Sequence, residues 1–123
     1  MPNERPDLDG WWVATRAKLG GLPLPAEALS DLALRLRRGT FRFGTDEGWI
    51  VINHRARPRT LDMVPARGPS RGRVVPAIIA VSGSSMRICC DLAGRCRPQE
   101  FKAPAGTRRF LASYRRVGPA VAP

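Results

Sequence analysis

The sequence predicts an all-β protein, a small antiparallel barrel of eight or nine strands with one short helix near the N-terminus. Short segments of alternating apolar and polar residues recur along the chain, turn residues separate them, and only one segment has a helical pattern. Such a meander is stable when its two ends pair, because closure removes exposed sheet edges. The length of 123 residues suits one domain, which we place at 8–117, between tails at 1–7 and 118–123 that we expect to be flexible.

The first strand and the helix lie near the N-terminus. Residues 8–16 mix aromatic and β-branched residues with polar ones, which favours a strand, and Gly20-Gly21 ends it. Pro25 stands where a first helical turn accepts proline, and Ala, Glu and Leu follow it. Residues 25–31 are therefore expected to form the short helix.

Residues 32–43 are expected to form a hairpin. Leucines and phenylalanines alternate with polar residues on both sides of Gly39. Phe41 and Phe43 should face the core, and three arginines should face outward: Arg35, Arg37 and Arg42.

The middle of the chain alternates between turns and strands. Residues 44–48 form a turn cluster, and the β-branched run 49–54 favours a strand. Pro58 precedes a further alternating strand over 59–64, and the Pro- and Gly-rich segment 65–72 is expected to be a loop.

The last third predicts a second hairpin and a closing strand. The apolar run 74–81 and residues 86–89 flank the turn 82–85. We expect a short strand at 100–102 and a long last strand at 108–116.

Seven short motifs follow one another between about residues 8 and 117. They are Leu8-x-Gly10-x-Trp12, Pro23-Leu24-Pro25, Pro58-x-Thr60-Leu61-Asp62, Gly68-Pro69-x-x-Gly72, Ile88-Cys89, Arg97-Pro98-x-Glu100-Phe101 and Arg115-Arg116. In this order they resemble a bacterial lipocalin-like domain family that is abundant in planctomycetes and also found in actinobacteria. The chain departs from the family pattern at Asn53-His54, where Asp-Pro is usual, at Ile79, where an aromatic residue is usual, and in the extra thiols of Cys90 and Cys96.

The resemblance implies a small antiparallel lipocalin-like barrel with Gly10-x-Trp12 on its first strand. The indole of Trp12 would fill the tapering end, and Arg115 or Arg116 from the last strand would cover its face. The family implies no activity for particular residues. Lipocalin-like barrels generally bind small, often apolar molecules, and some bacterial proteins of similar shape are cyclases or isomerases.

Arg97 and Phe101 belong to the densest of these motifs. We expect Arg97 to pair with Glu100 while Phe101 points into the core. The alternative is that Arg97 projects into the mouth of the barrel as an anchor for an anion, because its guanidinium matches the geometry of a carboxylate.

The charge balance is strongly basic, with 21 Lys and Arg against 10 Asp and Glu and a net charge of +11. Such a field attracts nucleic acid, anionic membrane surfaces or acidic partners. The basic residues are nearly all arginine and form no single block, which also fits a genomic preference for arginine codons. Phe41 and Phe43 should point inward and cannot stack on bases beside Arg42, so nucleic-acid binding is the weaker alternative.

The N-terminal segment is polar and acidic, unlike a secretory signal, and no apolar run approaches the roughly 18 residues of a membrane span. We therefore expect a cytoplasmic protein that does not cross a membrane. Cys89, Cys90 and Cys96 are an odd set with two adjacent members, which favours free thiols. A bond between Cys90 and Cys96 across a hairpin is the alternative.

Enzyme and metal signatures are weak. His54 is the single histidine and the cysteines lack paired CxxC spacing, so we expect no metal. A Ser-His-Asp triad would have to use His54 with Asp46 or Asp62, which their spacing does not support. Residues 68–72 lack the length and the Lys-Ser ending of a phosphate-binding loop, and we expect no cofactor.

The leading hypothesis is a barrel that binds a small apolar or amphipathic molecule. A cofactor-independent cyclase or isomerase acting on a hydrophobic intermediate is the first alternative. A basic module that binds nucleic acid or an acidic partner is the second. The expected ligand-binding residues are Phe41, Phe43, Ile50, Ile52, Met86, Ile88, Arg97, Phe101 and Tyr114.

Overall fold

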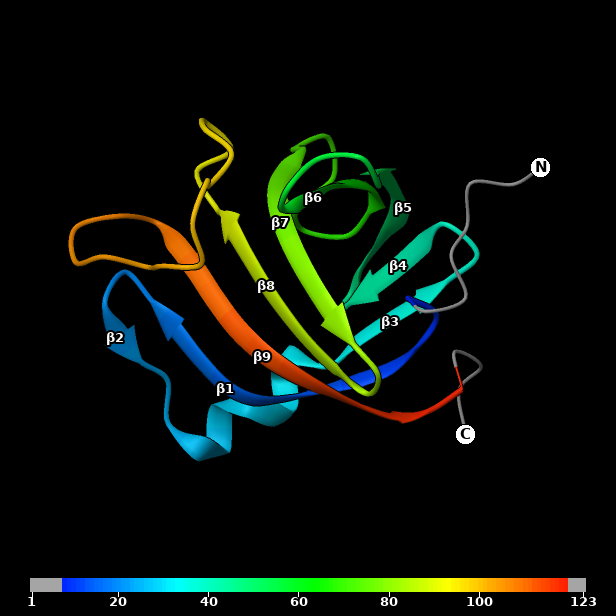
Figure 1. Cartoon of the computed structure of the whole chain (residues 1–123), viewed down its shortest axis with the longest axis horizontal. Helices are drawn as coiled ribbons and strands as arrows, with labels where there is room; N and C mark the ends of the chain where they lie inside the picture. The colour runs from blue at the N-terminus through cyan, green and yellow to red at the C-terminus, as the bar shows by residue number, and fades with distance from the viewer. Residues whose placement is uncertain (1–7, 120–123) are drawn as a thin grey trace.

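A computed structural model describes residues 8–119 and confirms the predicted fold class. The strands are β1 (Gly10–Leu19), β2 (Leu22–Pro23), β3 (Leu34–Arg37), β4 (Thr40–Phe43), β5 (Asp46–Asn53), β6 (Arg59–Arg67), β7 (Val75–Ser82), β8 (Ser85–Asp91) and β9 (Arg109–Gly118). They form one antiparallel sheet in the order β2-β1-β3-β4-β5-β6-β7-β8-β9, which closes where β9 pairs with β1 (Figure 1). Eight strands make the barrel, and β2 is an additional strand beside the end of β1.

The predicted hairpin of β3 and β4 is confirmed. Leu34, Leu36 and Phe41 are buried, and Phe43 packs against the core. Arg37 and Arg42 are exposed and Arg35 is partly exposed on the outer face. The period of two in this segment was therefore a correct guide to which residues face the core.

The one predicted helix is present as a short 3-10 helix, η1 (Ala26–Leu32), which follows β2. Leu29 and Leu32 pack against the barrel core. In Figure 1, η1 lies alongside β1, at the bottom of the view.

The expected turn at 44–48 is too long. Strand β5 already begins at Asp46, which pairs with Phe43, so only Gly44 and Thr45 connect β4 to β5. Gly44 has a φ of 61°, which glycine adopts without steric cost, and this allows the shorter turn.

Two other expectations are wrong. Strand β6 continues to Arg67 through the segment expected to be a loop from residue 65, with Pro65 buried. Residues 100–102 form no strand. They belong to the connection 92–108, which packs on the outer face of β7 and β8 through Arg97, Phe101 and Lys102. A small second core holds it there, made of Ile78, Cys89, Pro98 and Ala103.

The barrel has two chemically different ends. At the closed end, where β1 begins and β9 ends, Trp12 is completely buried. The open end is the opposite one, where β1, β6 and β8 end and β7 and β9 begin.

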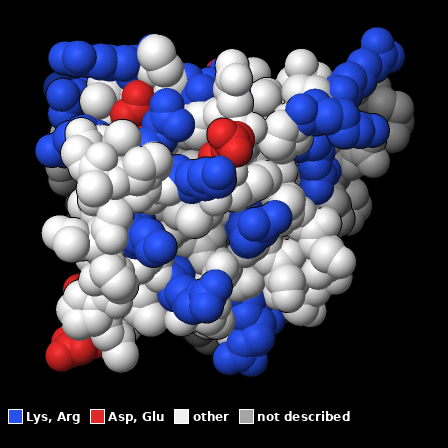
Figure 2. All heavy atoms as spheres, turned by 60° about the vertical axis from the view of Figure 1, so that its left-hand side comes forward, with Lys and Arg blue, Asp and Glu red and all other residues white. Residues whose placement is uncertain are grey.

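Lys and Arg side chains are scattered over the face shown in Figure 2, with few Asp and Glu among them. No helix within residues 8–119 is long and apolar enough to cross a membrane. The tail expected to begin at residue 118 is wrong at its first position, because β9 runs to Gly118. Residues 1–7 and 120–123 lie outside the described residues.

Candidate ligand-binding site

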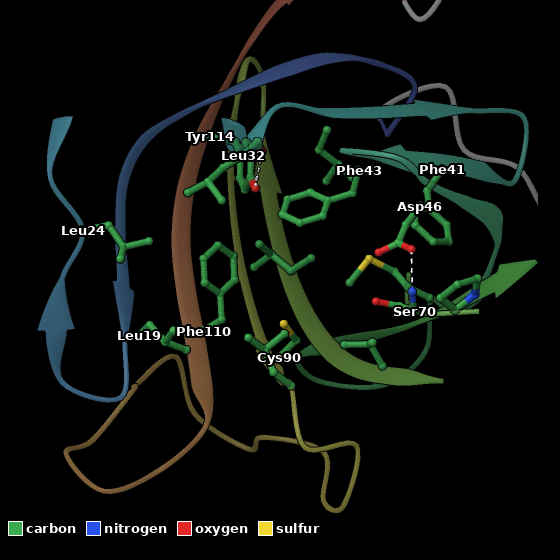
Figure 3. Close-up of a pocket in the computed structure, with 16 residues that line it drawn as sticks. Leu19, Leu24, Leu32, Phe41, Phe43, Asp46, Ser70, Cys90, Phe110 and Tyr114 are labelled. Atoms are coloured by element: carbon green, nitrogen blue, oxygen red, sulfur yellow. Dashed lines mark hydrogen bonds between the residues drawn. The ribbon is translucent and has the colours of Figure 1, made fainter. Parts of the chain in front are cut away.

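A cavity of about 250 Å³ occupies the barrel interior at the open end. Every barrel strand contributes a side chain to its wall, because inward positions alternate along each strand. The apolar lining consists of Leu19, Leu24, Leu32, Leu34, Phe41, Phe43, Met63, Pro65, Val75, Ile88, Leu92 and Phe110. Figure 3 shows these side chains converging on one space, which is thus shaped for an apolar molecule.

Within residues 8–119, Asp46 is the only charged residue that lines the cavity. Its Oδ1 accepts a hydrogen bond of 2.8 Å from the backbone N–H of Ser70, in the loop between β6 and β7. Figure 3 shows its second carboxylate oxygen turned toward the interior of the cavity. Among the described residues, none of the many basic side chains forms an ion pair with Asp46.

Tyr114 connects the cavity wall to η1. Its hydroxyl donates a hydrogen bond of 2.8 Å to the carbonyl oxygen of Leu32, the last residue of that helix. Burial raises the pKa of the Tyr114 hydroxyl, and the nearby Cys90 adds to the shift. Tyr114 therefore keeps its proton at neutral pH and serves as a donor.

Cys90 lines the cavity and is buried. Burial, together with the neighbouring Cys89 and Asp91, raises the pKa of its thiol to about 12. A thiol that stays protonated is a poor nucleophile, so Cys90 behaves as a small apolar wall residue. All three cysteines are free, with Cys90 inside the barrel and Cys96 exposed outside it.

The structure brings together four of the nine residues expected to bind a ligand: Phe41, Phe43, Ile88 and Tyr114 line the cavity. Three others, Ile50, Ile52 and Met86, pack in the core without lining it. They fill the interior between the cavity and the closed end.

Arg97 and Phe101 lie outside the barrel. Arg97 pairs with Asp62 at 2.7 Å rather than with Glu100, and it also donates a hydrogen bond of 3.0 Å to the carbonyl oxygen of Ala77. Phe101 does not point into the core, because its ring lies under Arg87, with 4.4 Å from the guanidinium carbon to the ring centre. Both residues fasten the 92–108 connection to the outer face of the sheet.

Several residues that line the cavity were not predicted from the sequence, and the most important of them is the charged residue Asp46. Asp46 has the same parity as Ile50 and Ile52, and this alternation was a usable signal once the strand was known to begin at residue 46. Residues 44–48 are of types common in turns, so the start of the strand at Asp46 was not recognised. Leu24, Ser70 and Leu92 come from connections, whose direction no periodicity predicts.

His54 lies in the turn after β5, at the closed end, and its Nδ1 is 3.4 Å from an Arg59 nitrogen. Asp46 is at the opposite end and Asp62 is paired with Arg97, so the structure does not assemble the triad. Residues 8–119 contain no group of three or more His, Cys, Asp or Glu side chains placed to hold a metal ion.

Comparison of the chain with models of protein families, with curated proteins and with solved structures found no match. The chemistry of the cavity is therefore the basis for the function.

Proposed function

We propose that this protein binds one small molecule with an apolar body and a hydrogen-bond donor at one end. The observation that carries the proposal is the cavity of about 250 Å³, whose wall is apolar except for a few placed polar groups. This combination is typical of binding sites, where apolar surface supplies affinity and a few polar groups fix orientation.

The volume limits the ligand. A dry protein cavity of roughly 150 Å³ holds a benzene molecule, and drug-sized ligands occupy about 300 to 1,000 Å³. A cavity of about 250 Å³ lies between these sizes. It suits a short alkyl chain or one to two small rings.

The polar end of the ligand is set by Asp46. Its carboxylate accepts hydrogen bonds, so a hydroxyl or amine donor is favoured beside it and a ligand carboxylate is repelled. The net charge of +11 opposes the approach of a cation over long range. A neutral alcohol therefore fits the site better than an amine.

Catalysis has less support than binding. An isomerase or cyclase would need a group that moves a proton, and the thiol of Cys90 and the hydroxyl of Tyr114 both keep theirs because burial raises their pKa values. Asp46 is left as the one base on the cavity wall. A carboxylate that has no partner acting as a general acid is better suited to orient a ligand than to catalyse a reaction.

We also infer membership of the bacterial lipocalin-like family. Supporting it are the buried Trp12 on the first strand and the guanidinium of Arg116 that covers its ring. Both features were expected from the resemblance before the structure was known.

Two experiments test the binding proposal. Native mass spectrometry of freshly purified protein should show a co-purifying small molecule. Displacement of the two-ring fluorescent probe 1-naphthylamine should then rank octanol above octylamine and octylamine above octanoate. Within a series of alcohols, each added CH₂ should tighten binding by about fourfold until the cavity is full.

Matched variants locate the site. Leu24→Trp fills the mouth, because Leu24 lines the cavity, and should abolish probe binding. Leu22→Trp adds the same side chain at a position that is 72% exposed and should leave probe binding unchanged. Asp46→Asn keeps an oxygen for the Ser70 N–H and adds a donor, so the preference should shift from octanol toward octanoate. Equal loss in both tryptophan variants would refute the assignment of this cavity.

A further inference from the structure

Exposed apolar side chains gather at the open end of the barrel. Leu22 follows β1 and is 72% exposed, Val74 precedes β7 and is 49% exposed, and Leu92 follows β8 and is 39% exposed. Leu92 also lines the cavity, so the apolar surface continues from the wall of the cavity to the outside. Single exposed apolar residues are ordinary, but a group at the entrance of an apolar cavity is typical of a contact surface.

Unpaired basic residues accompany this apolar group. Arg71 and Arg73 stand in the loop before β7, Arg95 follows β8, Arg108 precedes β9, and Lys18 lies near the end of β1. All five are exposed, and none forms an ion pair within residues 8–119. We call Leu22, Val74, Leu92 and these five basic residues the rim.

The acidic residues at the open end are directed elsewhere. Asp46 lines the cavity, and its Oδ1 accepts the hydrogen bond from the Ser70 N–H. Glu47 pairs with Arg42 and Arg67, which are not members of the rim.

Asp91 is buried, and its oxygens accept hydrogen bonds from the backbone N–H groups of Ala93, Arg95 and Cys96. The unpaired carboxylates of Glu27 and Asp31 belong to η1, at the bottom of Figure 1, whereas the loops before β7 and after β8 lie at the top. The rim thus combines three exposed apolar side chains with five exposed basic side chains.

We propose that the rim docks on an anionic lipid surface, so that the ligand passes between the membrane and the cavity without crossing water. The inference rests on the binding function proposed above, because it assigns the source of the ligand. Leucine and valine side chains enter the interfacial layer of the bilayer, while arginine and lysine contact the anionic headgroups around them. The open end then faces the lipid, and the ligand enters past Leu92.

A nucleic acid fits the rim less well. Phosphates would satisfy the arginines, but bases offer no site for three exposed aliphatic side chains, and single-strand binding depends on aromatic stacking. The three apolar members of the rim contain no aromatic residue. A lipid surface uses both halves of the rim, whereas a nucleic acid uses only the charged half.

Vesicle co-sedimentation of the whole chain tests the proposal. The protein should bind vesicles of phosphatidylcholine mixed with phosphatidylglycerol and not vesicles of phosphatidylcholine alone. Arg71→Gln with Arg73→Gln should lower the partition coefficient by about 30-fold, because each basic residue near an anionic surface contributes independently. Leu22→Ser with Val74→Ser should weaken binding to the same vesicles and should not change its salt dependence.

Matched controls remove the same charge or the same apolar surface elsewhere. Arg37→Gln with Arg115→Gln changes the net charge equally at two exposed positions toward the closed end. Val51→Ser removes a valine that is 55% exposed on the outer face of β5, as a control for Val74→Ser. These controls should bind the mixed vesicles within about twofold of the unmodified protein.

Ligand binding measured in solution separates the two proposals. Rim variants that keep 1-naphthylamine affinity but lose its rapid transfer from mixed vesicles to protein would support docking. Normal probe affinity without vesicle binding would overturn docking and leave the binding function intact. Equal losses in rim variants and controls, or tighter retention on single-stranded RNA than on mixed vesicles, would also overturn it. Vesicle binding without any probe affinity would overturn the binding function.

Discussion

The guanidinium carbon of Arg116 lies 4.6 Å from the centre of the Trp12 ring at the closed end of the barrel. Trp12 is fully buried, and its indole N–H donates a hydrogen bond of 3.0 Å to the carbonyl oxygen of Leu8. Arg116 also donates to the carbonyl oxygens of Asp9 and Gly83. The contact therefore joins the first strand, the last strand and the β7–β8 turn.

Trp12→Ala should lower the free energy of unfolding by about 3 to 5 kcal/mol, because it empties a buried site the size of an indole. Trp11→Ala should cost much less, since Trp11 is only partly buried, with outward parity. Urea unfolding followed by circular dichroism measures both values. A larger loss for Trp11→Ala would contradict the role given to Trp12.

Arg116→Lys should destabilise the protein by about 1 to 2 kcal/mol although the charge is retained, because an ammonium cannot lie flat on the indole and reach both carbonyl oxygens. The control is Arg115→Lys, at an exposed neighbouring position, which should be neutral within about 0.5 kcal/mol. Thermal melts of the two variants make the comparison. Equal shifts in melting temperature would mean that the planar guanidinium has no special role.

Thiol reactivity should separate the three cysteines. The exposed Cys96 should react quickly with a disulfide reagent in the folded protein. Cys89 and Cys90 should react only on unfolding, because both are buried and burial raises both thiol pKa values, that of Cys90 to about 12. Unfolded, unreduced protein should then titrate three thiols. A second fast thiol in the native state would show that the barrel opens at Cys90 or that the small second core opens at Cys89.

Asp91→Asn should destabilise the protein near neutral pH and not in acid. Hydrogen bonds from the backbone N–H of Cys96, and then of Ala93 and Arg95, lower the pKa of Asp91 below its usual 3.8. A lowered pKa in the folded state stabilises the fold above that value, and this contribution is lost as the pH falls through the folded pKa. The difference in unfolding free energy between the two proteins should be about 1 to 2 kcal/mol near neutral pH. It should shrink toward zero as the pH falls through the lowered pKa of Asp91 in the folded protein, as measured by urea titrations across pH.

The sequence was sufficient to predict which side chains face the core where apolar and polar residues alternate strictly along a strand with one buried face. The hairpin that contains Leu34, Leu36 and Phe41 is the clearest case. Along each of its strands, inward apolar residues alternate with outward arginine or threonine residues. The Trp12 contact was also predictable, since the resemblance placed both partners on the strands that close the barrel.

Interactions between distant segments were not predictable. Arg97 pairs with Asp62 across the outer face of the sheet, and only the folded path of the 92–108 connection brings them together. Local spacing favoured Glu100, which instead pairs with Lys102 at 3.3 Å. Asp46 was not predicted as a lining residue for a related reason. Residues 46–48 have the residue types of a turn, but pairing with β4 makes them the first residues of a strand.

The pairing of β1 with β9 has a kinetic consequence. All other barrel pairings join strands that follow one another in the chain, whereas the contact between Arg116 and Asp9 spans 107 residues. Closing so long a loop carries the largest entropy cost in the fold, so this pairing raises the contact order and limits the folding rate. Because this pairing limits folding, it forms in the transition state, and Trp12→Ala should slow refolding and leave the unfolding rate nearly unchanged.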